Sequence, residues 1–450
     1  MHPKDLIEDV NTGCNILRKF ILTSTILYCC FSGFTQWNYV GQAGISNDWT
    51  VENDIQTDTS GSPAIVFFEN QSEYKASCLR FDGIHWSQVG EETFGNFSIE
   101  SILDFEIDDK NNYYILYLDA DFSTSCIRYN GTTWEFVGSQ YISIEYSPYT
   151  SLAIDTAGTA YVAFQSQSGF SIVKENGESW MPVSLNGLPG VDRYFDLLFD
   201  KENVAFLGYC GMNGMVPNCA KLVNGNWEPV GSAVSFTLFA SETYLQITED
   251  RQLYMGFLEP DMGFHKFNTL TDGWEKIETA SLGENYMGIW DIISDSSSNI
   301  YISVLSDRAR CYKYDGSAWS QLGNSGISES EASYIRMAVN KHDELYATYN
   351  DYTESKAVVK KYDHTSNIDH ILQDLSFKIY PNPALDHFYI ESEGQKFTVL
   401  ISDVNGQLVY EHNMGTDRIE IDTHAFDRGV YIVRIRTAKG TYHNRKIIVL

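Results

Sequence analysis

Basic residues are scarce in this chain of 450 residues: 31 lysines and arginines stand against 60 aspartates and glutamates, a formal net charge of −29. A chain this acidic repels nucleic acid and anionic lipid, so we expect neither as a partner. Proline is also scarce, at ten residues, whereas aromatic residues make up 14% of the sequence. This composition excludes a disordered chain and favours a well-packed globular one.

Long apolar runs are lacking except at residues 20–34, directly after Arg18 and Lys19. A basic flank followed by an apolar run of this length is typical of a secretory signal peptide. The run is shorter than the roughly 20 residues that cross a bilayer. We therefore predict a signal peptide over residues 1–35, no transmembrane span, and a protein that is secreted or held at the outer cell surface.

Tryptophan recurs at intervals of 45 to 49 residues, in segments such as RYNGTTWEFVG at residues 128–138. The series consists of Trp37, Trp86, Trp134, Trp180, Trp227, Trp274 and Trp319. Trp49 and Trp290 lie outside this series. A fixed period of this length is the sequence signature of a repeat architecture.

An Asp-x-x-Gly-x-x-Tyr pattern recurs with the same period, as in SLAIDTAGTAYVAF around Asp155, and it predicts a hairpin. A third strand, a tight turn and the tryptophan strand follow, so each repeat supplies four short strands. Such repeats predict an all-β fold, a seven-bladed β-propeller over residues 36–363. The strand at Trp37 has no preceding partner, and we expect it to complete the last blade beside residues 358–363.

Cysteine is infrequent as well, with five residues after the predicted signal peptide. Cys78, Cys126, Cys219 and Cys311 each lie eight residues before a tryptophan of the series, and we expect them to be buried. Cys210 and Cys219 bracket a loop within one repeat, which predicts a disulfide in an exported protein. The odd number leaves at least one thiol outside any disulfide.

The sequence changes character after Asp363, with a polar linker at residues 364–376 and strand-like alternation over residues 377–450. Four segments of this block, IYPNPALDHFYIES, VLISDVNGQLVYE, IDTHAFDRGVYIVRI and NRKIIVL, resemble in order the C-terminal sorting domain of type IX secretion cargo in Bacteroidetes. The motif residues that carry the resemblance are Pro381, Asn382, Pro383, Asp403, Gly406, Gly429 and Tyr431.

This resemblance implies a small immunoglobulin-like β-sandwich that the type IX secretion translocon recognises. In that family a sortase-like peptidase usually removes the domain at the cell surface. The resemblance therefore implies two partners, the translocon and the peptidase, and a route of export.

Catalytic motifs are absent: the sequence has no H-E-x-x-H, no G-x-S-x-G and no phosphate-binding loop. Charged residues that recur in repeat phase are expected to radiate around the ring and not to converge on one substrate. Arg193 and Arg336 are too few for the arginine cluster of a sialidase. Asp192 and Glu145 are the carboxylates that break the repeat. Acidic turns such as residues 108–112 leave calcium open as a cofactor, although aspartate at that position also simply forms the turn.

Tyr141, Tyr146 and Tyr149 lie together in one long connection, where they could stack on sugar rings or contact a protein. They could equally cap the end of a blade. We expect a monomeric binding protein for glycan or protein ligands, without a cofactor. The alternative is a polysaccharide-active hydrolase or lyase, which a convergent pair of carboxylates in a mouth pocket would favour.

Overall fold

The computed structural model describes residues 37–69, 75–91, 94, 97, 99–212, 216–232, 241–258, 263–279, 282, 288–323, 326–353, 355–363, 377–392, 397–403, 408–412, 418–437 and 442–450. The chain divides into two compact units, residues 1–363 and residues 364–450, and each is described by itself. The predicted signal peptide and linker lie outside the described residues. No helix in the described part has the length and hydropathy that crossing a membrane requires.

The described part of the first unit contains seven four-stranded sheets, each an antiparallel blade. The first strands of the blades are β2 (Thr50–Thr57), β6 (Ser101–Ile107), β10 (Tyr149–Ile154), β14 (Val191–Phe199), β18 (Ser241–Ile247), β22 (Ile289–Ser294) and β26 (Ala332–Val339). The second strands are β3 (Pro63–Glu69), β7 (Tyr113–Leu118), β11 (Ala160–Ser166), β15 (Ala205–Gly211), β19 (Leu253–Leu258), β23 (Ile300–Leu305) and β27 (Leu345–Asp351).

The third and fourth strands complete each blade toward its outer edge. The third strands are β4 (Lys75–Phe81), β8 (Thr124–Tyr129), β12 (Gly169–Asn176), β16 (Val216–Val223), β20 (Gly263–Asn268), β24 (Ala309–Tyr314) and β28 (Lys356–Tyr362). The fourth strands are β5 (Trp86–Gln88), β9 (Trp134–Phe136), β13 (Ser179–Pro182), β17 (Asn226–Pro229), β21 (Gly273–Lys276), β25 (Trp319–Leu322) and β1 (Trp37–Tyr39).

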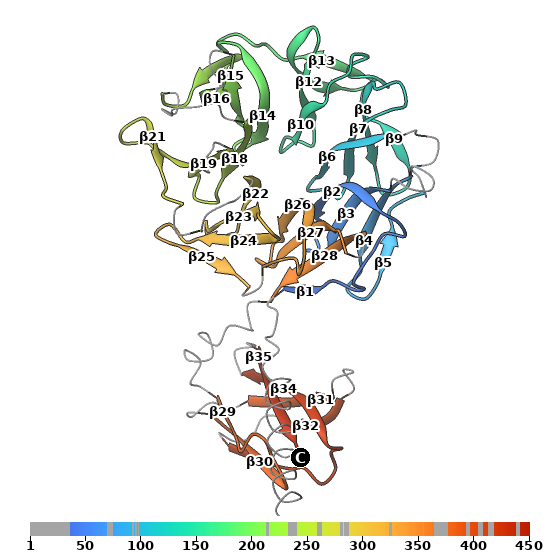
Figure 1. The fold of residues 1–450 in the computed structure, drawn as a ribbon, viewed down its shortest axis with the longest axis vertical. Coiled ribbons are helices and arrows are strands. Elements are labelled where there is room, and N and C mark those ends of the chain that lie inside the picture. The colour runs from blue at the N-terminus through green and yellow to red at the C-terminus, as the bar shows by residue number, and fades with distance from the viewer. Residues whose placement is uncertain are drawn as a thin grey trace, which may run out of the picture. The chain divides into compact units, whose positions relative to one another are not determined.

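The blades are arranged in a ring, with their first strands around its centre (Figure 1). Each first strand contacts the first strand of the next blade, and β26 of the last blade contacts β2. Apolar clusters fill the space between neighbouring blades, because successive strand residues point to opposite faces and both faces of each blade are covered. This is the arrangement of a β-propeller, and the predicted all-β class with four-stranded blades is confirmed.

The strand at Trp37 completes the last blade as predicted. β1 pairs antiparallel with β28, with Trp37 opposite Tyr362 and Tyr39 opposite Lys360. The last blade therefore has the strand order β1-β28-β27-β26. The pairing covers a sheet edge that would otherwise be open.

The repeating tryptophan and the Val-Gly that ends several repeats hold neighbouring blades together. The indole Nε1 of Trp134 donates to the carbonyl oxygen of Val89 in the preceding blade, at 3.2 Å. A Cβ atom on Gly90 would lie 2.5 Å from that nitrogen, and Gly90 has a φ of +70°. Glycine is therefore required here both by close approach and by backbone conformation.

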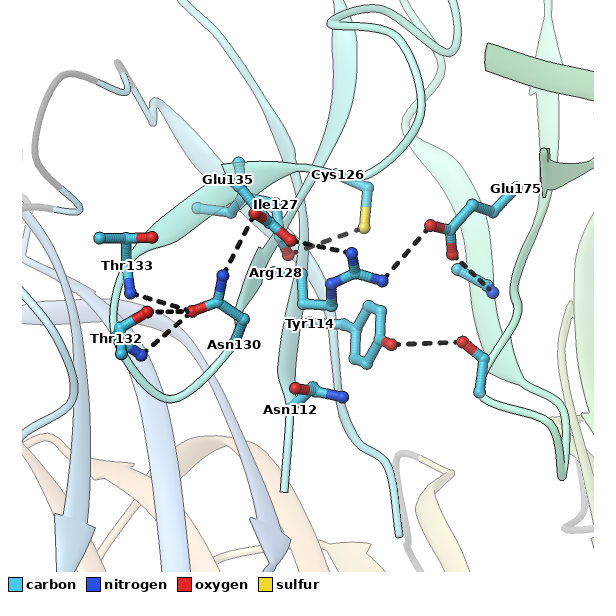
Figure 2. Close-up of polar contacts among 12 residues, drawn as sticks. Asn112, Tyr114, Cys126, Ile127, Arg128, Asn130, Thr132, Thr133, Glu135 and Glu175 are labelled. Carbon is cyan, nitrogen blue, oxygen red and sulfur yellow. Dashed lines mark hydrogen bonds and ion pairs between the residues drawn. The ribbon is translucent and has the colours of Figure 1, made fainter. Parts of the chain in front are cut away.

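A cation on the third strand is held by the same interblade packing. The guanidinium of Arg128 donates to Glu135 at 2.8 Å and to Glu175 of the next blade at 3.3 Å (Figure 2). It also lies 5.7 Å from the ring centroid of Tyr114, within cation–π distance. Because both sides of the blade boundary supply partners, this cation has a structural role.

The Asp-x-x-Gly turns form the predicted hairpins. The Asp108 carboxylate accepts hydrogen bonds from the main-chain nitrogens of Lys110 and Asn112, at 2.9 and 2.8 Å. The fourth residue of several turns reaches the preceding blade, as where Asn111 accepts from the main-chain nitrogen of Thr59 at 2.8 Å. The acidic turn at residues 108–112 thus uses its first carboxylate to form the turn.

The second unit consists of two antiparallel sheets. One contains β29 (Phe377–Tyr380), β30 (His387–Ser392) and β33 (Arg418–Asp422); the other contains β32 (Leu408–His412), β31 (Phe397–Asp403), β34 (Gly429–Thr437) and β35 (Tyr442–Val449). Their inner faces share one apolar cluster, which includes Phe388, Phe397, Val433 and Ile447.

Several motif residues of this unit have structural partners. Asn382, between Pro381 and Pro383, donates to the carbonyl oxygen of Lys446 and accepts from the main-chain nitrogen of Ile448, at 2.8 and 3.0 Å. Gly429 begins β34 and the buried Tyr431 donates to the carbonyl oxygen of Asp427. Asp403 ends β31, whereas Gly406 lies outside the described residues.

The predicted disulfide between Cys210 and Cys219 is wrong: the structure has both side chains as buried thiols. Cys210 lies opposite Pro217 and Cys219 opposite Gly208, so the two cysteines are diagonal neighbours on adjacent strands. Diagonal neighbours have Cα atoms about 7–8 Å apart, beyond the reach of an unstrained disulfide. The thiol of Cys210 instead lies 3.2 Å from the Thr243 hydroxyl of the next blade.

Candidate functional site

The two ends of the ring carry different connections. The turn end holds the Asp-x-x-Gly turns between first and second strands. The loop end holds the turns between second and third strands, such as residues 119–123, and the connections between blades, such as residues 139–148. The first strands run from the loop end to the turn end.

A cavity of about 480 Å³ lies among the first strands, at the centre of the ring. One repeat position, four residues before the first residue of each turn, lines it on every blade. The residues at this position, called here the upper row, are Asp54, Asp104, Ser151, Asp196, Tyr244, Asp291 and Arg336. Glu106, Gln56 and Gln246 line the cavity two residues further toward the turn end. Five carboxylates and one guanidinium therefore face a common space.

Most upper-row residues also bond to the next blade. Asp104 accepts a hydrogen bond from the main-chain nitrogen of Leu152 at 2.7 Å, and Asp196 accepts one from Leu245 at 2.8 Å. Asp291 accepts one from Met337 at 2.6 Å. The first strands are bulged near this position, which turns the side chains inward from the ladder.

Ser151 makes the same interblade bond without a charge. Its hydroxyl oxygen accepts from the main-chain nitrogen of Leu197 at 3.0 Å. A neutral side chain therefore suffices for the structural role at this position. The negative charges elsewhere in the upper row exceed what the interblade bond needs.

Partial removal from water raises the pKa of the half-buried cavity carboxyls, because it disfavours the ionised form. The pKa of Asp54 rises to about 8, that of Asp196 to about 7 and that of Asp104 to about 6. Mutual repulsion among the carboxylates adds to the shift, whereas Arg336 opposes it at Asp54 and Asp104. The pKa of Glu106 is raised well above its usual range by burial and by its four aspartate neighbours.

Arg336 is the one cationic side chain that lines this cavity among the described residues. Its Nη1 donates to the carbonyl oxygen of Trp290 at 2.8 Å. Glu106, in contrast, accepts no hydrogen bond from any described residue. The cavity thus holds more carboxyl groups than its one cation could balance if all of them were ionised.

Four aromatic residues lie toward the loop end of the ring, outside the lining of the central cavity. Trp290 and Tyr334 have ring centroids 6.5 Å apart, and Trp49 and Tyr352 have centroids 5.3 Å apart. These four residues, the aromatic rim, come from three consecutive blades, and Tyr334 and Tyr352 are exposed. Burial is the main cause of the raised pKa of Tyr334. Glu52 and Tyr352 also raise it by Coulombic interaction, so these side chains lie close together.

The predicted tyrosines Tyr141, Tyr146 and Tyr149 also lie at the loop end, but in separate contacts. Tyr146 packs edge-on against Phe122, with centroids 5.8 Å apart. Tyr149 packs edge-on against Tyr194 at 5.6 Å, with the guanidinium of Arg193 5.9 Å from its centroid. Tyr141 is exposed and its hydroxyl accepts from Gln140 at 3.0 Å.

The two carboxylates singled out from the sequence lie apart from the cavity. Glu145 accepts hydrogen bonds from the main-chain nitrogen and hydroxyl of Ser168, at 2.9 and 2.6 Å. Asp192 forms an ion pair with Arg193 at 3.7 Å. Neither residue lines the central cavity. In the part of the chain that the structure describes, no group of three His, Cys, Asp or Glu side chains is placed to hold a metal ion.

Sequence reasoning missed the cavity carboxylates and the aromatic rim. The expectation that charged residues in repeat phase cannot converge is wrong for the first strands, since those strands surround the axis. A signal was present for both features. Asp54, Asp104, Asp196 and Asp291 share one offset from the turn, and Trp49 and Trp290 are the two tryptophans outside the repeating series.

The ring of four-stranded blades defines a β-propeller, and the two-sheet unit is a separate C-terminal domain. Residues 378–450 match the family model of the secretion system C-terminal sorting domain. The chain thus carries a type IX sorting domain, which directs it to secretion or to the outer cell surface and implies interaction with that secretion system.

No curated protein matches the chain. Among solved structures, it is similar to PorZ, described as a surface component of the type-IX secretion system of Porphyromonas gingivalis, at 11% identity and a TM-score of 0.42, over 89% of this chain and 70% of that one. It is similar to the extracellular domain of the putative hybrid two-component system BT4673 from B. thetaiotaomicron, at 14% identity and a TM-score of 0.49, over 93% of this chain and 60% of that one.

A third similar structure is the six-bladed β-propeller lectin of Aleuria aurantia, at 12% identity and a TM-score of 0.41, over 62% of this chain and 96% of that one. All three similarities are too distant to bear on ligand, partner or activity.

Proposed function

We propose that the protein is an extracellular glycan-binding protein whose ligand lies across the aromatic rim at the loop end of the ring. The single observation that carries this proposal is the aromatic rim at the loop end of a ring whose centre is a polar cavity. Aromatic faces stack on the apolar faces of sugar rings, and carboxylates and amides below them bind hydroxyl groups. Tyr146 with Phe122, and Tyr149 with Tyr194, extend the aromatic surface of the same end.

The proposed organisation follows the sequence prediction. A signal peptide at residues 1–35 directs the chain to the periplasm, and a seven-bladed propeller spans residues 36–363. A linker at residues 364–376 leads to an immunoglobulin-like sorting domain at residues 377–450. The continuous contact of seven first strands supports the blade number, and the two packed sheets support the sandwich. We further propose that the protein is monomeric and comes from a Bacteroidetes bacterium. Its sorting domain interacts with the translocon and with a sortase-like peptidase.

A glycan array with the purified protein tests the binding proposal. We expect a set of glycans to bind, and Trp49→Ala and Tyr334→Ala to weaken binding at least tenfold, about 1.4 kcal/mol or more. Tyr334→Phe should retain most of the affinity because it keeps the ring. Leu270→Ala, at an apolar residue that is 94% exposed at the turn end, is the matched control and should bind as the parent does. Binding that survives both rim substitutions would contradict the proposed site.

A protein ligand remains an alternative for the same face, because exposed tyrosine and tryptophan also dominate protein interfaces. The glycan array distinguishes the two: a protein ligand leaves every glycan unbound. Rim substitutions would then weaken binding to a purified protein partner, and no glycan would bind to the parent or to the variants.

A second candidate function is a polysaccharide hydrolase or lyase, and the cavity carboxyls favour it. Asp54 and Asp196 have pKa values near neutrality beside Asp104, which is the arrangement that general acid–base chemistry uses. Release of reducing or unsaturated sugar ends tests this candidate. Turnover that Asp54→Asn abolishes would establish an enzyme, and binding without turnover would leave the binding protein.

A further inference from the structure

The charge balance of the central cavity calls for a counter-ion. Its carboxylates are Asp54, Asp104, Glu106, Asp196 and Asp291, against the single guanidinium of Arg336. Carboxylates that share one half-buried cavity repel one another, so a proton or a bound cation lowers their free energy. The cavity of about 480 Å³ has room for such a group.

The excess charge has no structural explanation within the ring. Ser151 makes the interblade bond with a neutral hydroxyl, at the repeat position where three other blades use aspartate for the same bond. Asp54 bonds only the main-chain nitrogen of its neighbour Ile55 among the described residues. Glu106 has no hydrogen-bond donor there at all. Charge that is retained at a cost in stability, without a structural partner, indicates a binding site.

The donor geometry favours an organic cation over a metal ion. A calcium ion needs six to eight oxygens at 2.3–2.6 Å. Among the described residues, no three acidic side chains are placed to bind one ion together. The carboxylates instead come from four different blades, with Asp104, Asp196 and Asp291 each already accepting a main-chain hydrogen bond. An ammonium group pairs well with a single carboxylate, so a ligand that carries several amino groups suits such dispersed oxygens.

The aromatic rim strengthens this assignment. Trp290 and Tyr334 come one and two residues before the upper-row residues Asp291 and Arg336, on the loop-end side, and the main-chain carbonyl oxygen of Trp290 accepts a hydrogen bond from Arg336. Aromatic faces attract ammonium groups as well as stacking on sugars. A ligand lying on the rim would thus place a pendant amine over the cavity.

We propose that the central cavity binds a protonated primary amine, and that the preferred ligand is an amino sugar chain with free amino groups. The second clause rests on the proposed glycan-binding function; the first clause does not. The amino groups of such a ligand enter from the loop end and pair with the cavity carboxylates Asp54, Glu106 and Asp196. The neutral N-acetylated form of the same sugar has no charge to place there.

Calorimetric titration of the full chain tests this proposal with three probes at pH 7.5: spermidine, glucosamine hexamer, and N-acetylglucosamine hexamer. We expect glucosamine hexamer to bind at least tenfold tighter than its N-acetylated counterpart, and spermidine to compete with it. Equal affinity for the two hexamers, together with no binding of spermidine, would overturn the proposal. Spermidine binding without any hexamer binding would support the amine site and count against the glycan function.

Variants separate an amine site from general damage to the ring. Glu106→Gln and Asp196→Ser should each lower amine affinity about tenfold, the effect of one charge-assisted hydrogen bond. Asp196→Ser copies the side chain of Ser151 and so retains an interblade acceptor. Glu178→Gln, at an exposed turn-end carboxylate, is the matched control.

Arg336→Gln provides a test of opposite sign. Removal of the competing guanidinium should raise amine affinity, because the like charge no longer repels the ligand. Arg336→Lys keeps the charge and should not raise it. Binding should also release protons, seen as a dependence of the titration heat on buffer, since a cation drives the cavity carboxyls to ionise. Unchanged affinity in Glu106→Gln and Arg336→Gln, in variants that melt as the parent does, would contradict the proposal.

Discussion

The indole Nε1 of Trp37 donates a hydrogen bond to the carbonyl oxygen of Leu322, 3.0 Å away and 285 residues along the chain. The same contact joins Trp86 to Val40 and Trp134 to Val89 at other blade boundaries. Trp37, in β1, therefore packs on the blade that precedes the last blade around the ring, although that neighbouring blade comes near the end of the propeller sequence.

Trp37→Ala should destabilise the first unit by about 3–5 kcal/mol, the usual cost of removing a large buried side chain. Trp37 is 2% exposed and packs against Tyr362 with centroids 5.3 Å apart. Urea unfolding followed by tryptophan fluorescence measures the change. Trp180→Ala, which removes a half-buried member of the same series, should cost less. Equal losses of unfolding free energy in Trp37→Ala and Trp180→Ala would indicate that Trp37 contributes only a local contact.

Gly90→Ala should cost more than Gly131→Ala. Both glycines have positive φ, +70° and +94°, so each alanine is strained by about 1–2 kcal/mol. Only at Gly90 would the new Cβ also meet Trp134, at 2.5 Å, whereas nothing lies within 4 Å at Gly131. Thermal unfolding of the two variants separates strain from collision. A larger loss for Gly131→Ala would contradict the role assigned to the Val-Gly motif.

The stability of the first unit should fall as pH rises from about 4 to 8. The pKa of Asp54 is about 8 in the folded protein, above its ordinary value near 3.9, so the folded state binds more protons than the unfolded state in this window. Each extra proton lowers the unfolding free energy by about 1.4 kcal/mol per pH unit. The contribution is fully present below pH 4 and lost above pH 8. The other groups that share the cavity are Asp104, Glu106, Asp196, Tyr244, Asp291 and Arg336.

Urea unfolding at several pH values measures this dependence, and Asp54→Asn supplies the control. The variant cannot ionise at this position, so its stability should vary less steeply between pH 6 and 8 than that of the parent. A steeper dependence in the variant, or parent stability that rises across this window, would contradict the raised pKa.

Asn382→Ala should destabilise the sorting domain by about 1–3 kcal/mol. Its amide bonds both the carbonyl oxygen of Lys446 and the main-chain nitrogen of Ile448, and so holds β35 to the segment before β30. Asn382→Asp keeps the acceptor and should lose only part of this free energy. Hydrogen exchange at Ile448 measures the effect. Unchanged protection there in Asn382→Ala would indicate that other contacts hold the strand.

The fold of the ring could be read from the sequence because its constraints are local and repeated. Asp155 and Gly158 form a hairpin whatever surrounds them, and the tryptophan spacing marks each blade boundary. The pairing of Trp37 with Tyr362 followed from counting strands and not from any local signal. Repetition thus substituted for long-range information.

The candidate site could not be read in the same way. Convergence of Asp54, Asp104 and Asp196 depends on which strand of each blade faces the axis, a property of the assembled ring. Repetition in phase predicts that side chains diverge, which holds for the cations of the third strands and is wrong for the first strands. The predicted Cys210–Cys219 disulfide is wrong for a related reason. Closeness in sequence does not determine which residues lie opposite each other on paired strands.

The junction between β1 and β28 also determines how the ring responds to mechanical force. Trp37 pairs with Tyr362, so the chain enters and leaves the ring at one point of one sheet. Tension applied across that point loads the three residue pairs of the junction one after another, starting with Trp37 and Tyr362, and not all together. The ring would therefore open by unzipping at β1 under a pull that leaves the interior of the other blades unloaded.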